Sequence, residues 1–234
     1  MSVLHIQTLA TGSTGNCYHI SDGSTALLLE AGIDFKKIQK GLNFKTSNIQ
    51  GLLITHEHKD HCKGVESCLK RGLKVYMTNG TKQALNLDYA QIRTIQARQS
   101  FRIGTWTIMP FDVQHDVAEP VGFLLQSDHG AKLLFATDTY YIKYKFKGLT
   151  HIMIECNYDQ QTLDSKLASG LHPAQYNRVQ RSHFGLENLL NFFKANDLTK
   201  VEEIHLLHLS DSNSNETYIK QEVAKATGKL IYIP

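Results

Sequence analysis

Short apolar runs recur along this chain and are separated by glycines or polar turns. Runs of this length, bounded by turn residues, are typical of strands rather than helices. Residues 101–109 and 121–126 alternate in part between apolar and polar, as half-buried antiparallel strands do. We therefore expect strands at 3–9, 17–20, 26–29, 49–54, 74–77, 101–109, 121–126, 132–136, 151–154, 204–209 and 229–233.

Helical spacing appears between several of these runs. Leu186, Leu189, Leu190 and Phe193 fall on one face of an amphipathic helix near the end of the chain. Further helices are expected at 33–42, within the helical segment 62–70 at residues 65–69, and from 81 to 85. Strands throughout with helices interspersed predict an α/β protein whose sheets are covered by helices. The sequence shows no internal repeat or proline-rich linker, so residues 1–234 are interpreted as a single domain.

Composition narrows the class of protein. The chain has 234 residues, of which 41% are hydrophobic and 20% charged, which is typical of a globular protein with a substantial core. No apolar run approaches the roughly 20 residues of a membrane span, and residues 1–5 lack the features of a secretory signal. We therefore expect a cytoplasmic protein without a membrane partner. The net charge of +3 permits a polyanionic partner without establishing one.

The four cysteines show no C-x-x-C pairing and are expected to be reduced, mostly buried thiols. They are Cys17, Cys62, Cys68 and Cys156. Cys62 directly follows a histidine and is a candidate minor metal ligand, although a packing role in a helix is the favoured interpretation.

The most informative segment runs from Thr55 to His61 and reads Thr-His-Glu-His-Lys-Asp-His. Imidazole nitrogens and carboxylate oxygens are ligands that zinc and similar divalent ions accept. His56 and His58 can project together from an extended segment, because side chains there repeat every two residues. Asp60 and His61 then lie on the next bend and point elsewhere. This division predicts two metal ions, each bound in part by one half of the motif.

Three later residues complete two coordination shells in this interpretation. His115, Asp138 and His208 each follow an apolar run, where a strand would present a side chain at its tip. Taken singly, such residues are more often surface or cap residues than ligands. His205 has the wrong spacing from His208 and is expected to face the other side of its strand.

The ordered set His56, His58, Asp60, His61, His115, Asp138 and His208 resembles the metallo-β-lactamase-fold hydrolase superfamily. The resemblance implies an αββα four-layer sandwich, with two mixed β-sheets flanked by helices. It implies that His56, His58 and His115 hold one ion. Asp60, His61 and His208 would hold the other, with Asp138 bridging. Many members carry aspartate where this chain has Glu30, whose expected role is to support the metal loop by hydrogen bonds.

Further segments resemble the YycJ/WalJ branch of that superfamily, a group of bacterial and phage cytoplasmic proteins considered nucleases. They are residues 12–16, Glu155 to Asp159, Arg181 to Phe184, and His208 to Ser210. The branch usually has Gly-His-Leu-Ser where this chain has Ser182-His183-Phe184-Gly185. His183 is retained while its neighbours differ.

The resemblance implies a hydrolase with two divalent ions, Zn²⁺ favoured and Mn²⁺ the alternative, about 3.5–4 Å apart with a bridging hydroxide. Asp60 would orient that hydroxide. His183 would protonate the departing oxygen or bind phosphate, or else be a helix-start histidine with a structural hydrogen bond. These roles suit a phosphodiesterase or nuclease acting on DNA or RNA.

Basic and aromatic residues alternate after Asp138, from Thr139 to Lys147, which suits nucleic acid, although an amphipathic loop packed on the core is equally common. Candidate substrate contacts are Ser13, Asn16, Lys143, Lys145 and Arg181. For the loop at 12–16, a tight turn is favoured over phosphate binding.

Two other functions remain open from the sequence. One is a hydrolase of thioesters, lactones or lactams on the same fold, and the other is a non-enzymatic, metal-stabilised binding module. Asp60 argues against the latter, because a structural zinc site needs no carboxylate to orient a nucleophile. The sequence does not indicate DNA against RNA, exonuclease against endonuclease, or the oligomeric state.

Overall fold

The computed structural model describes residues 4–234. These residues form two compact units. Unit 1 extends to Asp112 and also includes Val117–Ala131, whereas unit 2 comprises Val113–Asp116 and Lys132–Pro234. The expectation of a single domain therefore stays a prediction. The start of the first expected strand, at Val3, lies outside the described residues.

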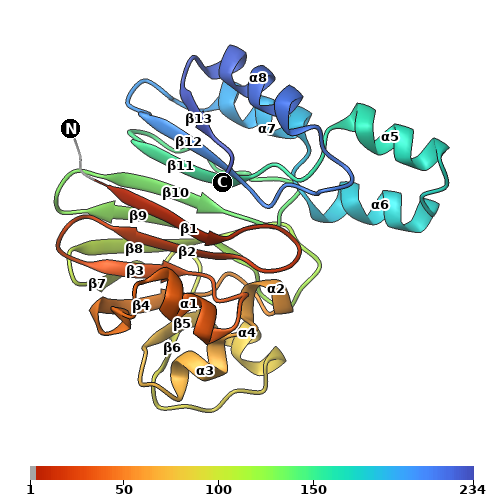
Figure 1. The fold of residues 1–234 in the computed structure, drawn as a ribbon. Coiled ribbons are helices and arrows are strands. Elements are labelled where there is room, and N and C mark those ends of the chain that lie inside the picture. Colours follow the sequence, from red (N-terminus) through yellow and green to blue (C-terminus); the bar gives the residue numbers. More distant parts are fainter. Residues whose placement is uncertain (1–3) are drawn as a thin grey trace. The chain divides into compact units, whose positions relative to one another are not determined.

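Unit 1 contains a mixed six-stranded sheet whose strands follow the chain order (Figure 1). The first three strands are antiparallel, and the third to the sixth are parallel. A parallel step needs a connection that crosses the sheet, and these connections carry the helices of the unit. The strands are β1 His5–Ala10, β2 Cys17–Ser21, β3 Ala26–Leu29, β4 Ile49–Leu53, β5 Val75–Thr78 and β6 Ile92–Ile95.

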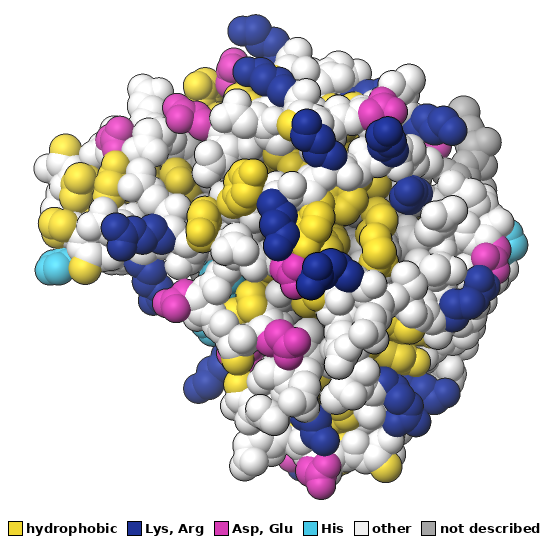
Figure 2. Space-filling view, turned by 180° about the vertical axis from the view of Figure 1, so that it is seen from behind, with side chains coloured by type: hydrophobic (Ala, Val, Ile, Leu, Met, Phe, Trp, Pro, Cys, Tyr) yellow, Lys and Arg dark blue, Asp and Glu magenta, His cyan; other side chains and the backbone are white. Residues whose placement is uncertain are grey.

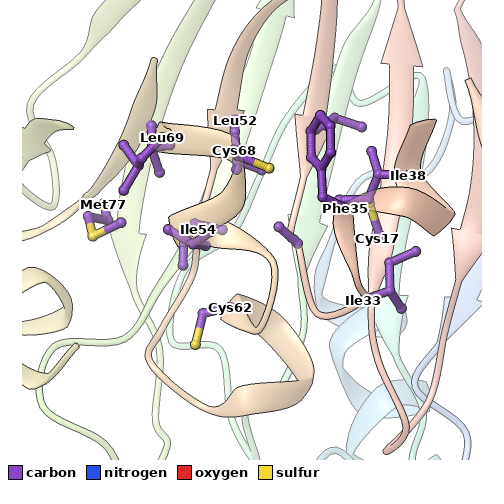
Figure 3. Packing of buried hydrophobic residues seen from close by; sticks show 14 of the residues in the cluster. Cys17, Ile33, Phe35, Ile38, Leu52, Ile54, Cys62, Cys68, Leu69 and Met77 are labelled. Atoms are coloured by element: carbon purple, nitrogen blue, oxygen red, sulfur yellow. The ribbon is translucent and has the colours of Figure 1, made fainter. Parts of the chain in front are cut away.

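Helices cover one face of this sheet and enclose an apolar core. Phe35 and Ile38 come from the first helix, and Cys68 and Leu69 from the third; they pack with Leu52 of the sheet (Figure 3). Burying each such side chain contributes about 1.5–3 kcal/mol. The elements are α1 Phe35–Gly41, the 3₁₀ helix η1 Thr46–Asn48, α2 Lys59–Cys62, α3 Val65–Leu69 and α4 Asn79–Ala84.

An antiparallel ladder completes unit 1. β7 Phe101–Ile103, β8 Trp106–Asp112 and β9 Val121–Ser127 pair in chain order. Trp106 is fully buried, and its Nε1 donates a hydrogen bond to the Thr25 carbonyl at 3.2 Å. This bond ties the ladder to the turn between β2 and β3.

Asp22 strengthens the same connection. Its carboxylate accepts hydrogen bonds from the Ser24 and Thr25 amides and from the Thr105 and Ser127 hydroxyls. Burial acts to raise the pKa of Asp22, but these hydrogen bonds outweigh burial and lower the pKa to about 2. Asp22 is thus an ionised structural residue of unit 1.

Unit 2 is built on four parallel strands, each hydrogen-bonded to the next along the chain. They are β10 Lys132–Ala136, β11 His151–Glu155, β12 Glu203–Leu207 and β13 Leu230–Tyr232. The carboxyl ends of parallel strands meet at one edge, where α/β proteins form their sites. The helices are α5 Gln160–Ala168, α6 Pro173–Ser182, α7 Leu186–Ala195 and α8 Glu216–Thr227.

Every strand and helix expected from the sequence has a counterpart within a few residues, apart from the unassessed Val3. The run at 101–109 proved to be two strands joined at Gly104. The expectations omitted β6, η1, α2, α5, α6 and α8, and α2 takes the place of the bend expected at Asp60 and His61. Helices α5, α6 and α8 bury few apolar side chains, so their sequences lack a wide apolar stripe.

The expected state of the cysteines is confirmed, since all four are free and buried. Burial raises the pKa of Cys62 to about 12, and its thiol donates a hydrogen bond to the Glu57 carbonyl at 3.0 Å. A thiol held this way packs in the helix and is a poor metal ligand at neutral pH. In residues 4–234, no helix is both long and apolar enough to cross a membrane.

Candidate metal centre

In unit 1 the donors lie directly after β4. Beyond the end of this buried strand, residues 54–58 form no regular secondary structure, and His58, whose backbone is extended, is the residue before the first turn of α2. The rings of His56 and His58 meet edge to face at 4.9 Å, as expected for alternating side chains of an extended segment. Asp60 and His61 lie within α2. The ring of His61 is 4.2 Å from that of His56, and its Nε2 is 3.2 Å from Asp60 Oδ2.

The Asn16 side chain helps to position Asp60 and His61. Its side-chain oxygen accepts hydrogen bonds from the Gly12 amide and the Tyr18 hydroxyl, so its amide nitrogen must face the other way. That nitrogen contacts the Asp60 carbonyl at 3.3 Å and His61 Nε2 at 3.2 Å. Asn16 is fully buried, so the geometry supports a positioning role, and its substrate role stays a prediction.

The close packing of the β3–α1 loop against α2 depends on a glycine. A Cβ atom at Gly32 would lie only 1.6 Å from the Asp60 carbonyl oxygen. No side chain fits at that distance, so Gly32 allows the backbone of the β3–α1 loop to pack directly against α2. Asp60 is thus held by its backbone as well as by its neighbours.

Glu30 is the buried support of the unit 1 donors, as the sequence predicted. Its Oε1 accepts a hydrogen bond from the Thr55 amide at 3.1 Å, and its Oε2 lies 3.7 Å from His61 Nδ1. A carboxylate beside Nδ1 favours a proton on that nitrogen, so Nε2 is unprotonated, the form in which an imidazole nitrogen binds a metal ion. Glu30 itself is fully buried.

In unit 2 the donors lie at the carboxyl ends of three adjacent parallel strands. Asp138 follows β10, Glu155 ends β11, and His208 follows β12. Nδ1 of His208 lies 3.7 Å from Asp138 Oδ1 and 3.1 Å from Glu155 Oε1. With His183, these residues form a group whose potential ligand atoms all lie within 4.8 Å of one another.

Glu155 is the centre of this group, although the sequence analysis gave it no role. Its Oε1 accepts a hydrogen bond from His183 Nδ1 at 2.6 Å, and its Oε2 accepts the amides of Thr139 and Phe184. Burial acts to raise the pKa of Glu155, but His183 and the hydrogen bonds lower it. Its place at the end of a buried strand, like that of Asp138, was the signal that could have revealed it.

The imidazole of His115 is oriented by a backbone carbonyl. Its Nδ1 lies 2.9 Å from the Ser182 carbonyl oxygen, which can only accept, so Nδ1 carries the proton. Nε2, which then carries no proton, faces Asp138 Oδ2 at 3.7 Å. Burial keeps the pKa of His115 below its ordinary value despite the nearby carboxylates, which favours the neutral form that binds metals.

Three residues at or beside the donors have a strained backbone conformation. Seven non-glycine residues among those described have a positive φ, and three of them are Glu30 (65°), Asp138 (47°) and His208 (54°). Such conformations cost of order 1 kcal/mol or more and persist where the surroundings enforce them. At the ends of β3, β10 and β12, the surrounding structure therefore holds these carboxylates and this imidazole in a backbone conformation that they would not adopt by themselves.

The remaining candidates occupy the surface. Ser13 is exposed in the Gly12–Gly15 turn, which Gly15 closes through its bond to the Gly12 carbonyl. Lys143 and Lys145 point outward from a segment whose Ile142 and Phe146 are buried, so this segment is amphipathic. Arg181 is exposed near the end of α6. Their contacts with substrate stay predictions.

His205 behaves as expected from its spacing. Its Nε2 lies 3.0 Å from Glu203 Oε1, and its ring stacks on Tyr232 at 4.9 Å. It therefore takes part in packing of the sheet rather than in the donor group.

The chemistry of the donors fits divalent metal ions. Both units present clustered, mostly buried imidazoles and carboxylates. A carboxylate or a carbonyl lies beside one ring nitrogen of His61, His115 and His208, as is usual for metal-binding histidines. These His/Asp clusters are consistent with a binuclear metal site.

Comparison with known proteins identifies the family. The model of the beta-lactamase superfamily domain matches residues 25–208, and the chain belongs to this superfamily. The exodeoxyribonuclease YycJ of Bacillus anthracis is 29% identical over 95% of this chain and 88% of its own length. The exodeoxyribonuclease WalJ of Streptococcus pneumoniae is 29% identical over 88% of this chain and 81% of its own. The expected resemblance to the YycJ/WalJ branch is confirmed.

Solved structures confirm the fold class. The metallo-beta-lactamase fold protein YhfI of Bacillus subtilis superimposes with a TM-score of 0.74 at 15% identity, covering 99% of this chain and 95% of its own. The protein therefore has the expected metallo-β-lactamase fold, with two mixed sheets and helices. It is a metallo-β-lactamase-fold hydrolase with His/Asp donor clusters.

Proposed function

We propose that this protein is a metal-dependent phosphodiesterase that degrades DNA from an end. The buried and oriented His and Asp donors support the metal-dependent hydrolase. The full-length similarity to two proteins named exodeoxyribonucleases supports DNA and the exonuclease mode. That similarity is the observation on which the choice among hydrolase substrates depends.

The proposed ligands are those implied by the family. His56, His58 and His115 would hold one divalent ion, Asp60, His61 and His208 the other, and Asp138 would bridge them. When bound, two such ions supply Lewis-acid stabilisation of phosphate oxygens and lower the pKa of the attacking water. Zn²⁺ suits a set rich in imidazole, and Mn²⁺ is the alternative for its carboxylates.

His183 is the proposed proton donor to the departing oxygen. Burial acts to lower the pKa of His183, but Glu155 at 2.6 Å raises it above the ordinary value. Glu155 holds Nδ1, so Nε2 is the nitrogen available to donate a proton to a leaving group. Asp60 would orient the attacking water, and His183 would supply the proton at the other end of the breaking bond.

The test is to load purified protein with Zn²⁺ or Mn²⁺ and incubate it with end-labelled DNA and RNA. We expect stepwise shortening of DNA from one end, about two metal equivalents per chain, and loss of activity with a chelator that added metal restores. Faster cleavage of RNA than DNA would overturn the proposed substrate. Hydrolysis of a thioester or lactone without cleavage of phosphodiesters would overturn the reaction class.

A further inference from the structure

A cleft of about 620 Å³ lies within unit 2 beside one of the proposed metal ligands. One wall is formed by His115, Asp116 and Tyr140, and the opposite wall by Asn177, Arg178 and Arg181 of α6. Its volume falls within the range of about 300–1,000 Å³ that small ligands occupy in proteins. The cleft is therefore large enough for a nucleotide of a longer chain.

The residues of α6 that line the cleft all lie on one face of that helix. Ala174, Asn177, Arg178 and Arg181 follow the spacing of a single helix face. Other positions of α6 contact α5, since the Tyr176 hydroxyl donates to Asp164 at 2.7 Å and Gln180 donates to Gln160 at 3.0 Å. These bonds anchor α6 to α5 through residues other than those that line the cleft, which include the exposed Arg178 and Arg181.

The opposite wall is fixed to the candidate metal centre. The Tyr140 amide donates to the Gln114 carbonyl at 3.2 Å, and His115 Nδ1 contacts the carbonyl of Ser182 at the end of α6. Both walls thus end at the same ligand. Tyr140 is 37% exposed, so its ring is accessible to a flat partner.

The chemistry of the lining suits a single nucleic-acid strand. Arginine binds phosphates, and an exposed tyrosine ring stacks on an unpaired base. Asp116 offsets part of the positive charge, which favours a few local phosphate contacts over a broad basic surface. On the face that Figure 2 displays, Lys and Arg side chains are interspersed with Asp and Glu and with uncharged surface.

We infer that this α6 cleft binds the unpaired DNA strand that flanks the scissile phosphodiester. Arg178 and Arg181 contact backbone phosphates, and Tyr140 stacks on a base. The inference rests on the proposed function, and it adds that the substrate enters as a single strand along α6.

The experiment measures fluorescence anisotropy of metal-loaded protein with a labelled, phosphorothioate-linked oligothymidylate and with a blunt duplex. For Arg178→Ala with Arg181→Ala we expect about tenfold weaker binding of the single strand. A plot of the logarithm of the binding constant against the logarithm of the salt concentration should be less steep by about 1.4, since each lost contact with a single strand contributes about 0.7 to the slope. Arg178→Lys with Arg181→Lys should retain most of that salt dependence.

Matched controls come from α8. Lys220→Ala with Lys225→Ala also removes two exposed cations, and we expect a change within twofold. Tyr140→Ala should weaken binding about fivefold or more, whereas Tyr218→Ala, at 40% exposure, should not. Equal binding of duplex and single strand, or equal losses in the α8 controls, would overturn the inference.

Hydrolysis of bis(p-nitrophenyl) phosphate separates this inference from the proposed function. Cleavage of this small diester by the wild-type protein tests the metal chemistry, and the arginine variants are compared with the wild type on DNA. A wild-type protein that cannot cleave it or DNA would refute the proposed function. A wild type that cleaves both, with arginine variants unchanged on DNA, would refute only the α6 cleft.

Discussion

The two units present metal-type donors in opposite ways. In unit 1, His56, His58, Asp60 and His61 come from one short stretch that leaves β4 and enters α2. In unit 2, the donors are far apart in the sequence and meet because adjacent parallel strands end at one edge. The first arrangement is a property of a local segment, whereas the second is a property of the sheet.

A buried glutamate supports each arrangement. Glu30 accepts a hydrogen bond from the Thr55 amide and lies 3.7 Å from the His61 imidazole, while Glu155 contacts two backbone amides and the imidazoles of His183 and His208. Glu155 therefore joins histidines from separate elements, whereas Glu30 supports the single run from His56 to His61. In unit 2, contacts between residues far apart in the sequence position the donors, whereas in unit 1 the donors are neighbours in a single segment.

The largest expected effect comes from the contiguous donors. Asp60→Asn should lower kcat on DNA by about 10³-fold or more, because a neutral amide is a weak metal ligand and orients the attacking water poorly. Turnover and metal content of the variant would be measured together. Asp88→Asn, an exposed carboxylate of unit 1, is the control. Wild-type turnover by Asp60→Asn would refute the proposed mechanism.

His183 should give the next largest effect, and one that depends on the leaving group. His183→Ala is expected to lower kcat on DNA by about 10²-fold, since DNA releases a basic alkoxide that needs a proton. Hydrolysis of bis(p-nitrophenyl) phosphate should fall much less, because p-nitrophenolate leaves without one. His129→Ala is the exposed control. Equal losses on both substrates would show that His183 is not the proton donor.

The two glutamates test the comparison directly. Glu155→Gln and Glu30→Gln should each weaken metal affinity or activity by about 10–100-fold, the range for groups that orient metal ligands. Glu155→Gln should have the larger effect because it holds two imidazoles. Competition with a chelating indicator would measure metal affinity, with the exposed Glu216→Gln as control. A larger effect at Glu30 would reverse our ranking of the two units.

The smallest effect on activity is expected at Asp22, which supports the fold of unit 1 away from the donors. Its pKa of about 2 lies below the ordinary value, so its stabilisation is present above pH 4 and is lost as pH falls through 2. Asp22→Asn should lower the free energy of unfolding at pH 7 by about 1–2 kcal/mol, allowing for solvent screening. The difference from wild type should shrink at acid pH.

Denaturant unfolding at several pH values would measure the free energy of unfolding of the wild type and of Asp22→Asn. The turnover of Asp22→Asn should stay within twofold of the wild type at a temperature where the variant is folded. Loss of turnover as large as that of Asp60→Asn would mean that the donor variants also act through stability.

The sequence by itself determined the donor run from His56 to His61 and most of the strands. Both are local: an extended segment sets which side chains share a face, and short apolar runs bounded by turns form buried strands. It also singled out Asp138 and His208, because each follows an apolar run. Helices α5 and α6 were missed since their stability comes from polar contacts between them rather than from an apolar stripe.

Only the tertiary structure decided the role of Glu155 and the orientation of the imidazoles. Glu155 holds His183 and His208 across separations of 28 and 53 residues. The tautomer of His115 is set by a carbonyl 67 residues away. No local pattern encodes such partners, because they are brought together by the order of parallel strands. The strained backbone at Glu30, Asp138 and His208 likewise exists only where the surrounding fold enforces it.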